Sequence, residues 1–355
     1  MKEKYHAVGP EAGYAKGTFD PAAYENSALG RTTAEMRGIY DQYKGDQMNP
    51  AVLAYWKEKG VKKEVFDADK EAEQMMFSVL TPLKTEKDHK YPLIYCLHGG
   101  GEDIFSAEVY GYGLLTGMGN CITVCPTAST HGNPMVEAEF IRILGFLKEH
   151  AYPVDFTRVY VVGFSGGEGA TQRLAMLHAD KIAGIGPTPG PNSFRGVSLP
   201  ILQAGYNEKF GLDMPMICLG GSEDGGDMWP LNTQQCVNSF NFCMQNVVKA
   251  KNYKQLTLDE TCRIARTSPN TVSRLFGLEF DESWINKLED TYIYFGDFYN
   301  EKGWPMARFG SIIGMPHIQC PEQAMLIWSF LRQFSRDLKT GALRFDKAEV
   351  GGANK

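Results

Sequence analysis

The stretch that decides the fold is RVYVVGFSGGEGATQRLAML, residues 158–177, in which one serine stands between glycines. Residues 159–162 suit a buried strand, and a helix-like segment begins directly after the glycines. A sharp strand-to-helix turn forces its central residue, Ser165, into a strained backbone conformation, so its neighbours must lack bulky side chains. The Ser165 hydroxyl is then lifted clear of the sheet, at a helix N-terminus that favours developing negative charge. G-x-S-x-G in this setting is typical of a nucleophile; an idle serine in a glycine-rich turn is the alternative.

A serine hydroxyl is a weak nucleophile without a base, and His317 is the best candidate for that base. In sheets that carry this motif, the acid follows the serine along the chain and the histidine follows the acid. Of the seven histidines, only His178 and His317 come after Ser165. His178 lies on the helix that the turn begins, roughly 20 Å from its start at ~1.5 Å per residue, which is too far. His317 lies in GMPHIQCPE, a loop before a capped helix, where a base can be aimed at the sheet edge.

The acid is expected in PMICLGGSEDGGDMWP, residues 215–230, which offers Glu223, Asp224 and Asp227. Asp224 is preferred because the apolar run ends at Leu219 and a short turn then presents this residue. Asp227 is the reserve, and either aspartate could instead be a solvated loop charge. The proposed task of the acid is to accept the Nδ1–H of His317, which holds the tautomer that can take the serine proton.

A glycine-rich turn, LHGGGED over residues 97–103, directly follows the first long apolar run. Its three glycines let backbone N–H groups approach a tetrahedral oxyanion. Gly100 or Gly101 is the expected donor, with the Gly166 N–H as the second donor. Taken alone the motif could be only a tight turn, but beside the turn at Ser165 it predicts an oxyanion hole.

Continuous apolar runs such as YPLIYCL and CITVCP alternate with helix-like segments and end in glycine-rich loops. This alternation predicts an α/β protein with a doubly wound, mostly parallel sheet, in which ligands bind at the carboxyl ends of the strands. We expect an N-terminal helical extension before the sheet and a helical and aromatic cap inserted into it. The predicted division is an extension over residues 1–70, a core over residues 71–227, a cap insertion over residues 228–305, a second core segment over residues 306–340 with the candidate histidine and the last helix, and a tail over residues 341–355.

The insertion over residues 228–305 is rich in aromatic side chains. This composition suggests an apolar or aromatic acyl or alcohol group in the substrate, such as a phenolic ester. Packing of the cap around itself explains the same residues equally well. The candidate substrate-binding residues are His98, Phe164, Trp229 and Trp304.

One segment of the insertion, LTLDETCRIARTSPNTVSRLFGL over residues 256–278, resembles the helix-turn-helix of bacterial sugar-responsive repressors. Its turn has Arg266, Thr267 and Ser268 in place of the usual glycine. Residues 251–290 contain six Lys or Arg and seven Asp or Glu, so they form no basic footprint for DNA. Two small helices of a cap are the preferred interpretation, and DNA binding is a remote alternative.

The composition suits a globular protein with a full core, since 43% of the 355 residues are hydrophobic and 22% are charged. The formal net charge of −6 argues against nucleic-acid partners and anionic membranes. No run approaches the ~20 apolar residues of a membrane span. The first residues show no apolar signal region, so we expect a cytoplasmic protein, with a secreted protein whose signal was removed as the alternative.

Eight cysteines in this length are far too few for a disulfide scaffold. The spacing of Cys121 and Cys125 resembles a metal motif, but CITVCP suits a buried strand. We therefore expect no metal site. A homo-oligomer is possible.

The chain resembles the α/β-hydrolases, and most of all the branch that holds feruloyl esterases and polyhydroxybutyrate-depolymerase-like esterases. The resemblance rests on YPLIYCLHGGG, VDFTRVYVVGFSGG, PMICLGGSED and GMPHIQCPE, spread over residues 91–320. These motifs are specific for the fold and for serine hydrolysis, and weak for the substrate. They imply a serine carboxylic-ester hydrolase that acts through an acyl-enzyme on a feruloyl-like or short-chain hydroxyacyl ester. The chain departs from that branch at Gly220 and Gly221, where a His-Gly pair is frequent.

Two other functions remain open from the sequence. A serine peptidase or amidase of the same fold would use the same side chains, although such enzymes usually add a large propeller that 355 residues cannot hold. A non-catalytic binding protein could keep the pocket alone. The expected partner is a small-molecule ester, and no metal or organic cofactor is implied because the serine, histidine and aspartate complete the chemistry.

Overall fold

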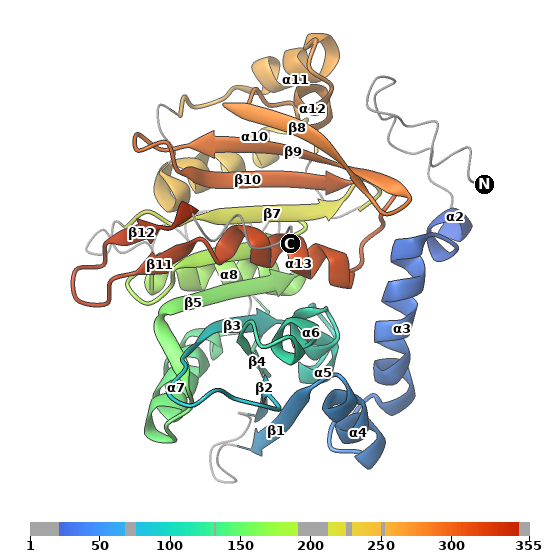
Figure 1. Ribbon diagram of the computed structural model, residues 1–355. Coiled ribbons are helices and arrows are strands. Elements are labelled where there is room, and N and C mark those ends of the chain that lie inside the picture. The colour runs from blue at the N-terminus through green and yellow to red at the C-terminus, as the bar shows by residue number, and fades with distance from the viewer. Residues whose placement is uncertain are drawn as a thin grey trace.

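The computed structural model describes residues 21–67, 76–130, 133–190, 212–224, 229–249 and 253–347. The strands of its main sheet are β1 (Val61–Asp67), β2 (Met76–Pro82), β3 (Tyr91–Leu97), β4 (Ile122–Pro126), β5 (Val154–Phe164), β6 (Gly184–Thr188), β7 (Met216–Gly221), β8 (Glu282–Leu288), β9 (Thr291–Tyr299) and β10 (Pro305–Ile312). Within the described residues they form one ten-stranded sheet in the order β1-β2-β4-β3-β5-β6-β7-β10-β9-β8 (Figure 1). A second, two-stranded sheet pairs β11 (Phe334–Arg336) with β12 (Leu343–Phe345).

The centre of the main sheet is parallel from β4 through β3, β5, β6 and β7 to β10. Antiparallel pairs extend it on both sides, with β1 and β2 at one end and β9 and β8 at the other. Every residue of β3, β4, β6 and β7 is buried, as continuous apolar runs predict for strands covered on both faces.

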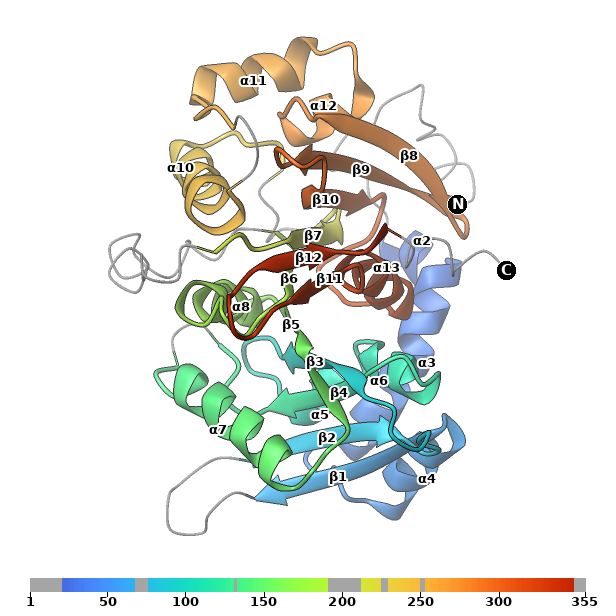
Figure 2. The same ribbon diagram turned by 60° about the vertical axis from the view of Figure 1, so that its left-hand side comes forward.

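Helices cover both faces of the sheet (Figure 2). One face carries α7 (Val136–Glu149), α8 (Gly166–Leu177) and α10 (Gln234–Cys243), and the other carries α6 (Tyr112–Gly117) and α13 (Pro321–Leu331). The remaining helical elements are α2 (Pro21–Glu25), α3 (Ala28–Tyr43), α4 (Pro50–Glu58), α5 (Ile104–Glu108), the π-helix η2 (Met244–Val248), α11 (Leu258–Thr267) and α12 (Thr271–Phe276). The predicted doubly wound, mostly parallel α/β class is therefore confirmed. Among the described residues, no helix has both the length and the apolar character needed to span a membrane.

The segment predicted as a helical and aromatic cap, residues 228–305, differs from that expectation in its second half. It contains α10, α11 and α12, but β8 and β9 then join the main sheet as its edge. The sequence of β9, TYIYFGDFY, combines aromatic and β-branched side chains, which suit a pleated sheet surface. On this edge the ring of Trp284 stacks on Phe295 at 5.3 Å, and the Arg308 guanidinium lies 4.8 Å from the Trp284 ring centre. Much of the aromatic content therefore serves sheet packing.

The helix-turn-helix-like segment forms the short pair α11 and α12 at the end of the molecule beyond β8 (Figure 1). A capping box at Thr257 and Glu260 starts α11, and α12 is six residues long. Val272 and Phe276 of α12 are buried. The Arg274 guanidinium donates to Ser268 O of its own segment at 3.1 Å. This arginine, the last residue of the repressor-like stretch Ser-Pro-x-Thr-Val-Ser-Arg, is thus engaged within the pair.

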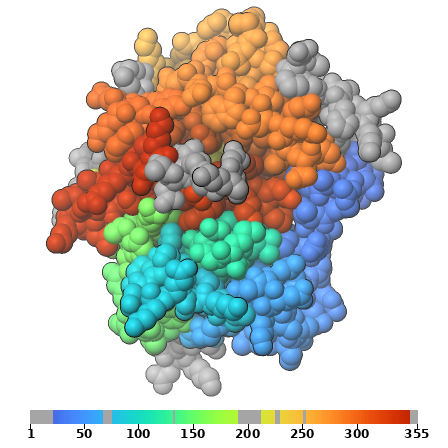
Figure 3. All heavy atoms as spheres, in the orientation of Figure 1, coloured from blue at the N-terminus to red at the C-terminus, as the bar shows by residue number. Residues whose placement is uncertain are grey.

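The N-terminal helix α3 lies along the carboxyl edge of the central strands, beside the arrowheads of Figure 1. Its first residue, Ala28, donates its N–H to Asp290 Oδ2 at 3.0 Å, and Thr32 donates to Glu322 Oε2 at 3.1 Å. Asp290 lies in the β8–β9 turn, and Glu322 follows the loop that leaves β10, so both lie at that edge. Figure 3 shows the N-terminal segment, in blue, running down this side of the molecule. Within the segment predicted as an extension, residues 1–70, the helix α3 thus lies beside the carboxyl edge, whereas β1 pairs with β2 and belongs to the main sheet.

Lys63 and Glu108 form a buried ion pair that joins β1 to α5. Lys63 Nζ lies 2.7 Å from Glu108 Oε2, and neither side chain is exposed (0%). Trp56 of α4 donates its Nε1–H to the same oxygen at 3.2 Å. Burial raises the pKa of Glu108, and the charge of Lys63 opposes that rise. The pair depends on both partners, because a buried charge without its counter-ion is costly.

We predict that Lys63→Met lowers the free energy of unfolding by about 3–5 kcal/mol, because it leaves the Glu108 carboxyl buried without a cation. The double variant Lys63→Met/Glu108→Leu should recover most of that loss. Urea unfolding followed by circular dichroism measures both. The neighbouring Lys62, whose side chain is 58% exposed, provides the control: Lys62→Met should cost less than ~1 kcal/mol. Equal losses of unfolding free energy in Lys63→Met and Lys62→Met would show that burial of the Lys63–Glu108 pair does not determine the effect of the substitution.

Candidate active site

The turn at Ser165 has the strained geometry that its sequence predicts. The strand β5 ends at Phe164, the helix α8 begins at Gly166, and Ser165 between them has φ 54° and ψ −114°. This positive φ is uncommon for a residue with a side chain. The Ser165 N–H donates to Thr188 O at the end of β6 at 2.8 Å, which fixes the turn against the neighbouring strand. The serine therefore stands at the carboxyl edge of the parallel strands, at the start of a twelve-residue helix.

The glycines around Ser165 are needed because other backbone segments pass very close to them. A Cβ on Gly163 would overlap the Gly167 carbonyl. A Cβ on Gly167 would lie 2.7 Å from Leu97 O, and one on Gly166 would lie 3.0 Å from Gly100 N. The loop that follows β3 therefore rests directly on the turn. The Gly100 backbone, predicted to supply an oxyanion donor, lies beside Gly166, the other predicted donor.

Asp224 and His317, chosen from the sequence as acid and base, are hydrogen-bonded to each other. Nδ1 of His317 lies 2.8 Å from both carboxylate oxygens of Asp224. Asp224 follows β7, and His317 lies in the loop between β10 and α13. Asp224 is 1% exposed, whereas the His317 side chain is 40% exposed. The alternative acid, Asp227, lies outside the described residues.

The two loops that carry this pair are fastened together. Ser222 donates its N–H to Ile312 O at 2.9 Å, and its hydroxyl accepts the Gly314 N–H at 2.8 Å. A Cβ on Gly221 would overlap the Met315 carbonyl. Because β7 and β10 are parallel neighbours, both loops leave the sheet at the edge where Ser165 stands. The close approach also explains a glycine at position 221.

The surroundings of His317 favour its protonated form. The hydrogen bond that the His317 ring donates to Asp224 raises the pKa of His317, burial of the ring lowers it, and the charges of Asp224 and Glu102 raise it further, so the net shift is upward. The ring stacks on Phe164, with centroids 4.5 Å apart and planes at 29°. Phe164 is only 5% exposed, and its other contacts include the Tyr110 ring at 5.6 Å. Phe164 was predicted to bind substrate, and the structure places it against the imidazole.

The predicted binding residue His98 is buried under the glycine-rich loop. Its Nδ1 lies 2.8 Å from Gly99 O and its Nε2 lies 3.1 Å from Thr127 O. The ring therefore ties the loop after β3 to the loop after β4. His178, excluded by distance, lies at the end of α8 with Nε2 3.2 Å from Glu137 Oε1.

Two predicted substrate-binding tryptophans are placed differently from the expectation. Trp229 is 3% exposed and packs edge-on against Phe276 at 4.9 Å and Phe309 at 5.4 Å, so it belongs to the core. Trp304 comes directly before β10, at the opposite end of that strand from His317, roughly 25 Å away at ~3.3 Å per residue. Its ring contacts Phe345 of β12 at 5.7 Å. Aromatic content alone could not separate packing residues from binding residues.

The sequence patterns gave no role to Glu102 or Tyr110, which the structure places at the glycine-rich loop. Glu102 Oε2 accepts the Gly99 N–H at 3.0 Å and the Tyr110 hydroxyl. The position of Glu102 directly after three glycines was the sequence feature that could have indicated its role. Nothing in the local sequence pointed to Tyr110, because it reaches the loop from beyond α5.

No group of three or more His, Cys, Asp or Glu side chains that could hold a metal occurs among the described residues. All eight cysteines are free thiols, and seven are buried. Cys121 directly precedes β4 and Cys125 belongs to it. Burial raises the pKa of the Cys121 thiol to about 12.

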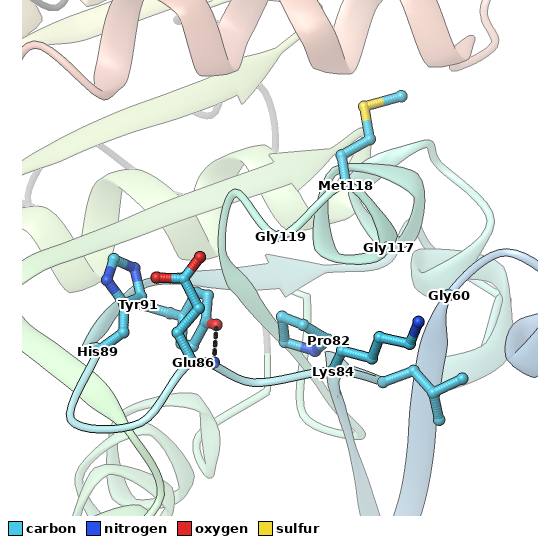
Figure 4. Close-up of a pocket in the computed structure, with 10 residues that line it drawn as sticks. Gly60, Pro82, Lys84, Glu86, His89, Tyr91, Gly117, Met118 and Gly119 are labelled. Atoms are coloured by element: carbon cyan, nitrogen blue, oxygen red, sulfur yellow. Dashed lines mark hydrogen bonds between the residues drawn. The ribbon is translucent and has the colours of Figure 1, made fainter.

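A surface hollow of about 530 Å³ lies at the other edge of the sheet (Figure 4). It is lined by the end of β2 at Pro82 and the start of β3 at Tyr91, together with Lys84, His89 and Met118. Because Tyr91 begins the strand whose far end leads to His98, this hollow and the candidate site lie on opposite edges.

No protein-family description and no curated protein matches this chain. Among solved structures, a ferulic acid esterase is similar at 20% identity and TM-score 0.29, covering 36% of this chain and 56% of that one. A thermostable esterase is similar at 17% identity and TM-score 0.36, covering 51% of each chain. An S-formylglutathione hydrolase from Agrobacterium tumefaciens is similar at 14% identity and TM-score 0.40, covering 53% of this chain and 84% of that one.

The chain thus spans about half the length of the first two of these proteins. The mostly parallel sheet with helices on both faces and the strand–serine–helix turn at its carboxyl edge form the α/β-hydrolase fold. The predicted fold-level resemblance is confirmed.

We predict that the His317 imidazole titrates above its ordinary pKa of 6.5 and that Asp224→Asn lowers this pKa. Asparagine still accepts a hydrogen bond but carries no charge, so it stabilises the imidazolium less. Histidine ring resonances followed by NMR across the pH range measure the shift. Asp155→Asn, near the amino end of β5, is the control and should leave the titration unchanged. An unchanged pKa of His317 in Asp224→Asn would contradict the hydrogen-bonded geometry.

Proposed function

We propose that this chain is a serine hydrolase that cleaves carboxylic esters through an acyl-enzyme. The observation that carries the proposal is the His317–Asp224 hydrogen bond of 2.8 Å at the sheet edge where Ser165 occupies its strained turn. A nucleophile, a base and an acid that orients the base are the parts that acyl transfer requires. They come from three separate loops, after β5, β7 and β10.

In the proposed reaction, Ser165 Oγ attacks the ester carbonyl while Nε2 of His317 takes the hydroxyl proton. Asp224 accepts the Nδ1–H, which leaves Nε2 as the free base and stabilises the imidazolium that forms. The tetrahedral intermediate then collapses, and the alcohol leaves with the proton held by His317. Water repeats the sequence on the acyl-enzyme: His317 takes its proton, the acid is released, and the proton returns to Ser165.

The oxyanion of the intermediate is proposed to lie between two backbone segments. One supplies the Gly166 N–H at the first position of α8, and the other supplies the N–H of Gly100 or Gly101. The 3.0 Å approach of Gly100 N to the Cβ position of Gly166 supports this assignment, because it brings both segments to one side of the serine. Gly101 has φ +76°, a conformation that glycine adopts without strain.

The site geometry leaves the class of ester broad. A preference for aromatic substrates was based partly on Trp229, which is buried, and on Trp304, whose ring contacts Phe345. Feruloyl esters and short hydroxyacyl esters are therefore both reasonable substrates. An amide substrate would use the same residues. An ester and an amide that carry the same acyl group should therefore be assayed in parallel. Faster turnover of the amide would show that the protein is an amidase rather than an esterase.

We predict that Ser165→Ala lowers p-nitrophenyl acetate turnover by a factor of roughly 10⁴–10⁶, because the alcohol that forms the acyl-enzyme is lost. Labelling by a fluorophosphonate probe should disappear with it. Ser329→Ala on the exposed side of α13 is the matched control and should keep both turnover and labelling. Ester turnover that survives Ser165→Ala would refute the proposal, as would absence of turnover and labelling in the unmodified protein.

A further inference from the structure

We propose that Glu102 is a positioning residue of this site, which holds the glycine-rich loop in its working shape and acts electrostatically on His317. This inference rests on the proposed function, since it assigns a task in the same reaction. It also makes the N-terminal helix α3 part of the active site, because Glu102 is held from that helix by Arg37.

Both carboxylate oxygens of Glu102 are engaged. Oε2 accepts the Gly99 N–H at 3.0 Å and the hydroxyl of Tyr110, while Oε1 lies 3.6 Å from Nη1 of Arg37. The Glu102 N–H donates back to Gly99 O at 3.3 Å, which closes the tight turn through Gly100 and Gly101. The side chains of Glu102 and Arg37 are 19% and 28% exposed, so their attraction is only partly screened by water.

The loop needs such a fixed point because of its composition. Three consecutive glycines have the largest backbone freedom that a chain can have, and ordering them costs conformational entropy. Backbone N–H groups stabilise an oxyanion well only when they are already aimed at it before the charge develops. The Glu102 carboxylate accepts the Gly99 N–H and so fixes the first peptide of the turn. This also restricts the orientation of the next two N–H groups, those of Gly100 and Gly101.

Tyr110 connects this fixed point to the histidine. Its oxygen lies 3.1 Å from the Gly99 nitrogen, and burial raises the pKa of Tyr110, so the hydroxyl keeps its proton and donates to Glu102. Its ring contacts Phe164 edge-on at 5.6 Å, and Phe164 stacks on His317 at 4.5 Å. The glycine-rich loop and the His317 imidazole are therefore connected through the packed rings of Tyr110 and Phe164.

The charge of Glu102 acts on His317 directly. Among the described residues, the charges that raise the pKa of His317 are those of Asp224, from the loop after β7, and Glu102, from the loop after β3. Asp224 has the larger influence, and Glu102 raises the pKa of His317 further. Arg37, from α3, faces Glu102. The carboxylate thus favours the imidazolium that forms when the serine proton is transferred.

The decisive variant is Glu102→Gln, which keeps the size of the side chain and one acceptor oxygen but removes the charge. We expect kcat for p-nitrophenyl acetate to fall roughly 10- to 100-fold with KM within about twofold, because transition-state binding depends on the loop. The acid limb of the kcat/KM profile should move to lower pH, because the neutral His317 base persists to lower pH once the negative charge is gone.

Two further variants separate the parts of the effect. Tyr110→Phe keeps the ring on Phe164 and removes the hydroxyl, so kcat should fall while the acid limb stays in place. The double variant with Glu102→Gln should lose less than the product of the two single losses, because both side chains hold one N–H. Glu86→Gln, at the hollow on the opposite edge, is the matched control and should change neither kcat nor the acid limb.

Each outcome decides the inference. Wild-type kcat and an unmoved acid limb in Glu102→Gln overturn it, and so does a loss of kcat with an unmoved acid limb, which indicates a merely structural role. If Glu102→Gln does not fold, Tyr110→Phe decides, and unchanged kcat in that variant overturns the inference. Failure of the proposed function is distinct from these results, because the unmodified protein would then show neither ester turnover nor fluorophosphonate labelling.

Discussion

The close contact between the loop after β3 and the turn at Ser165 is the constraint on which the rest of the site depends. Gly166 and Gly167 leave no room for a side chain, so two backbone segments lie against each other with nothing between them. The strands β5 and β3 thereby bring Ser165 and the glycine-rich loop to the same edge of the sheet. Because β7 and β10 end at the same edge, Asp224 and His317 reach this edge from loops that are fastened together.

Much of this arrangement could be predicted from local sequence because it is determined locally. The strained conformation of Ser165 follows from a buried strand running into a helix through glycines, and the observed φ of 54° agrees. Asp224 and His317 were chosen by chain order and by their place after apolar runs, and the structure places His317 Nδ1 2.8 Å from the Asp224 carboxylate. Continuous burial of β3 likewise follows from its unbroken apolar run, YPLIYCL.

The expectations that differed depended on long-range packing, which local patterns do not contain. Trp229 and Trp304 were indistinguishable in sequence from residues that line a pocket. Trp229 packs against Phe276 and Phe309, and Trp304 precedes β10 and contacts Phe345. The strands β8 and β9 were hidden in an aromatic insertion, since aromatic side chains suit a sheet surface as well as a cap. The contact of Arg37 with Glu102 joins the helix α3 to the loop after β3, two segments that share no sequence pattern.

The anchoring of α3 has a consequence for how the chain is made. The helix is held through Asp290 and Glu322, and 290 residues separate Thr32 from Glu322. Synthesis at about 5–20 residues per second spans that separation in roughly 15–60 s. The apolar side chains Met36 and Tyr40 of α3 pack in one cluster with Trp56, Phe105 and Val109, so they meet their partners early in synthesis. The start of α3, by contrast, can form its hydrogen bonds from Ala28 and Thr32 only after Asp290 and Glu322 have been synthesised, so the two ends of one helix reach their final contacts at different times.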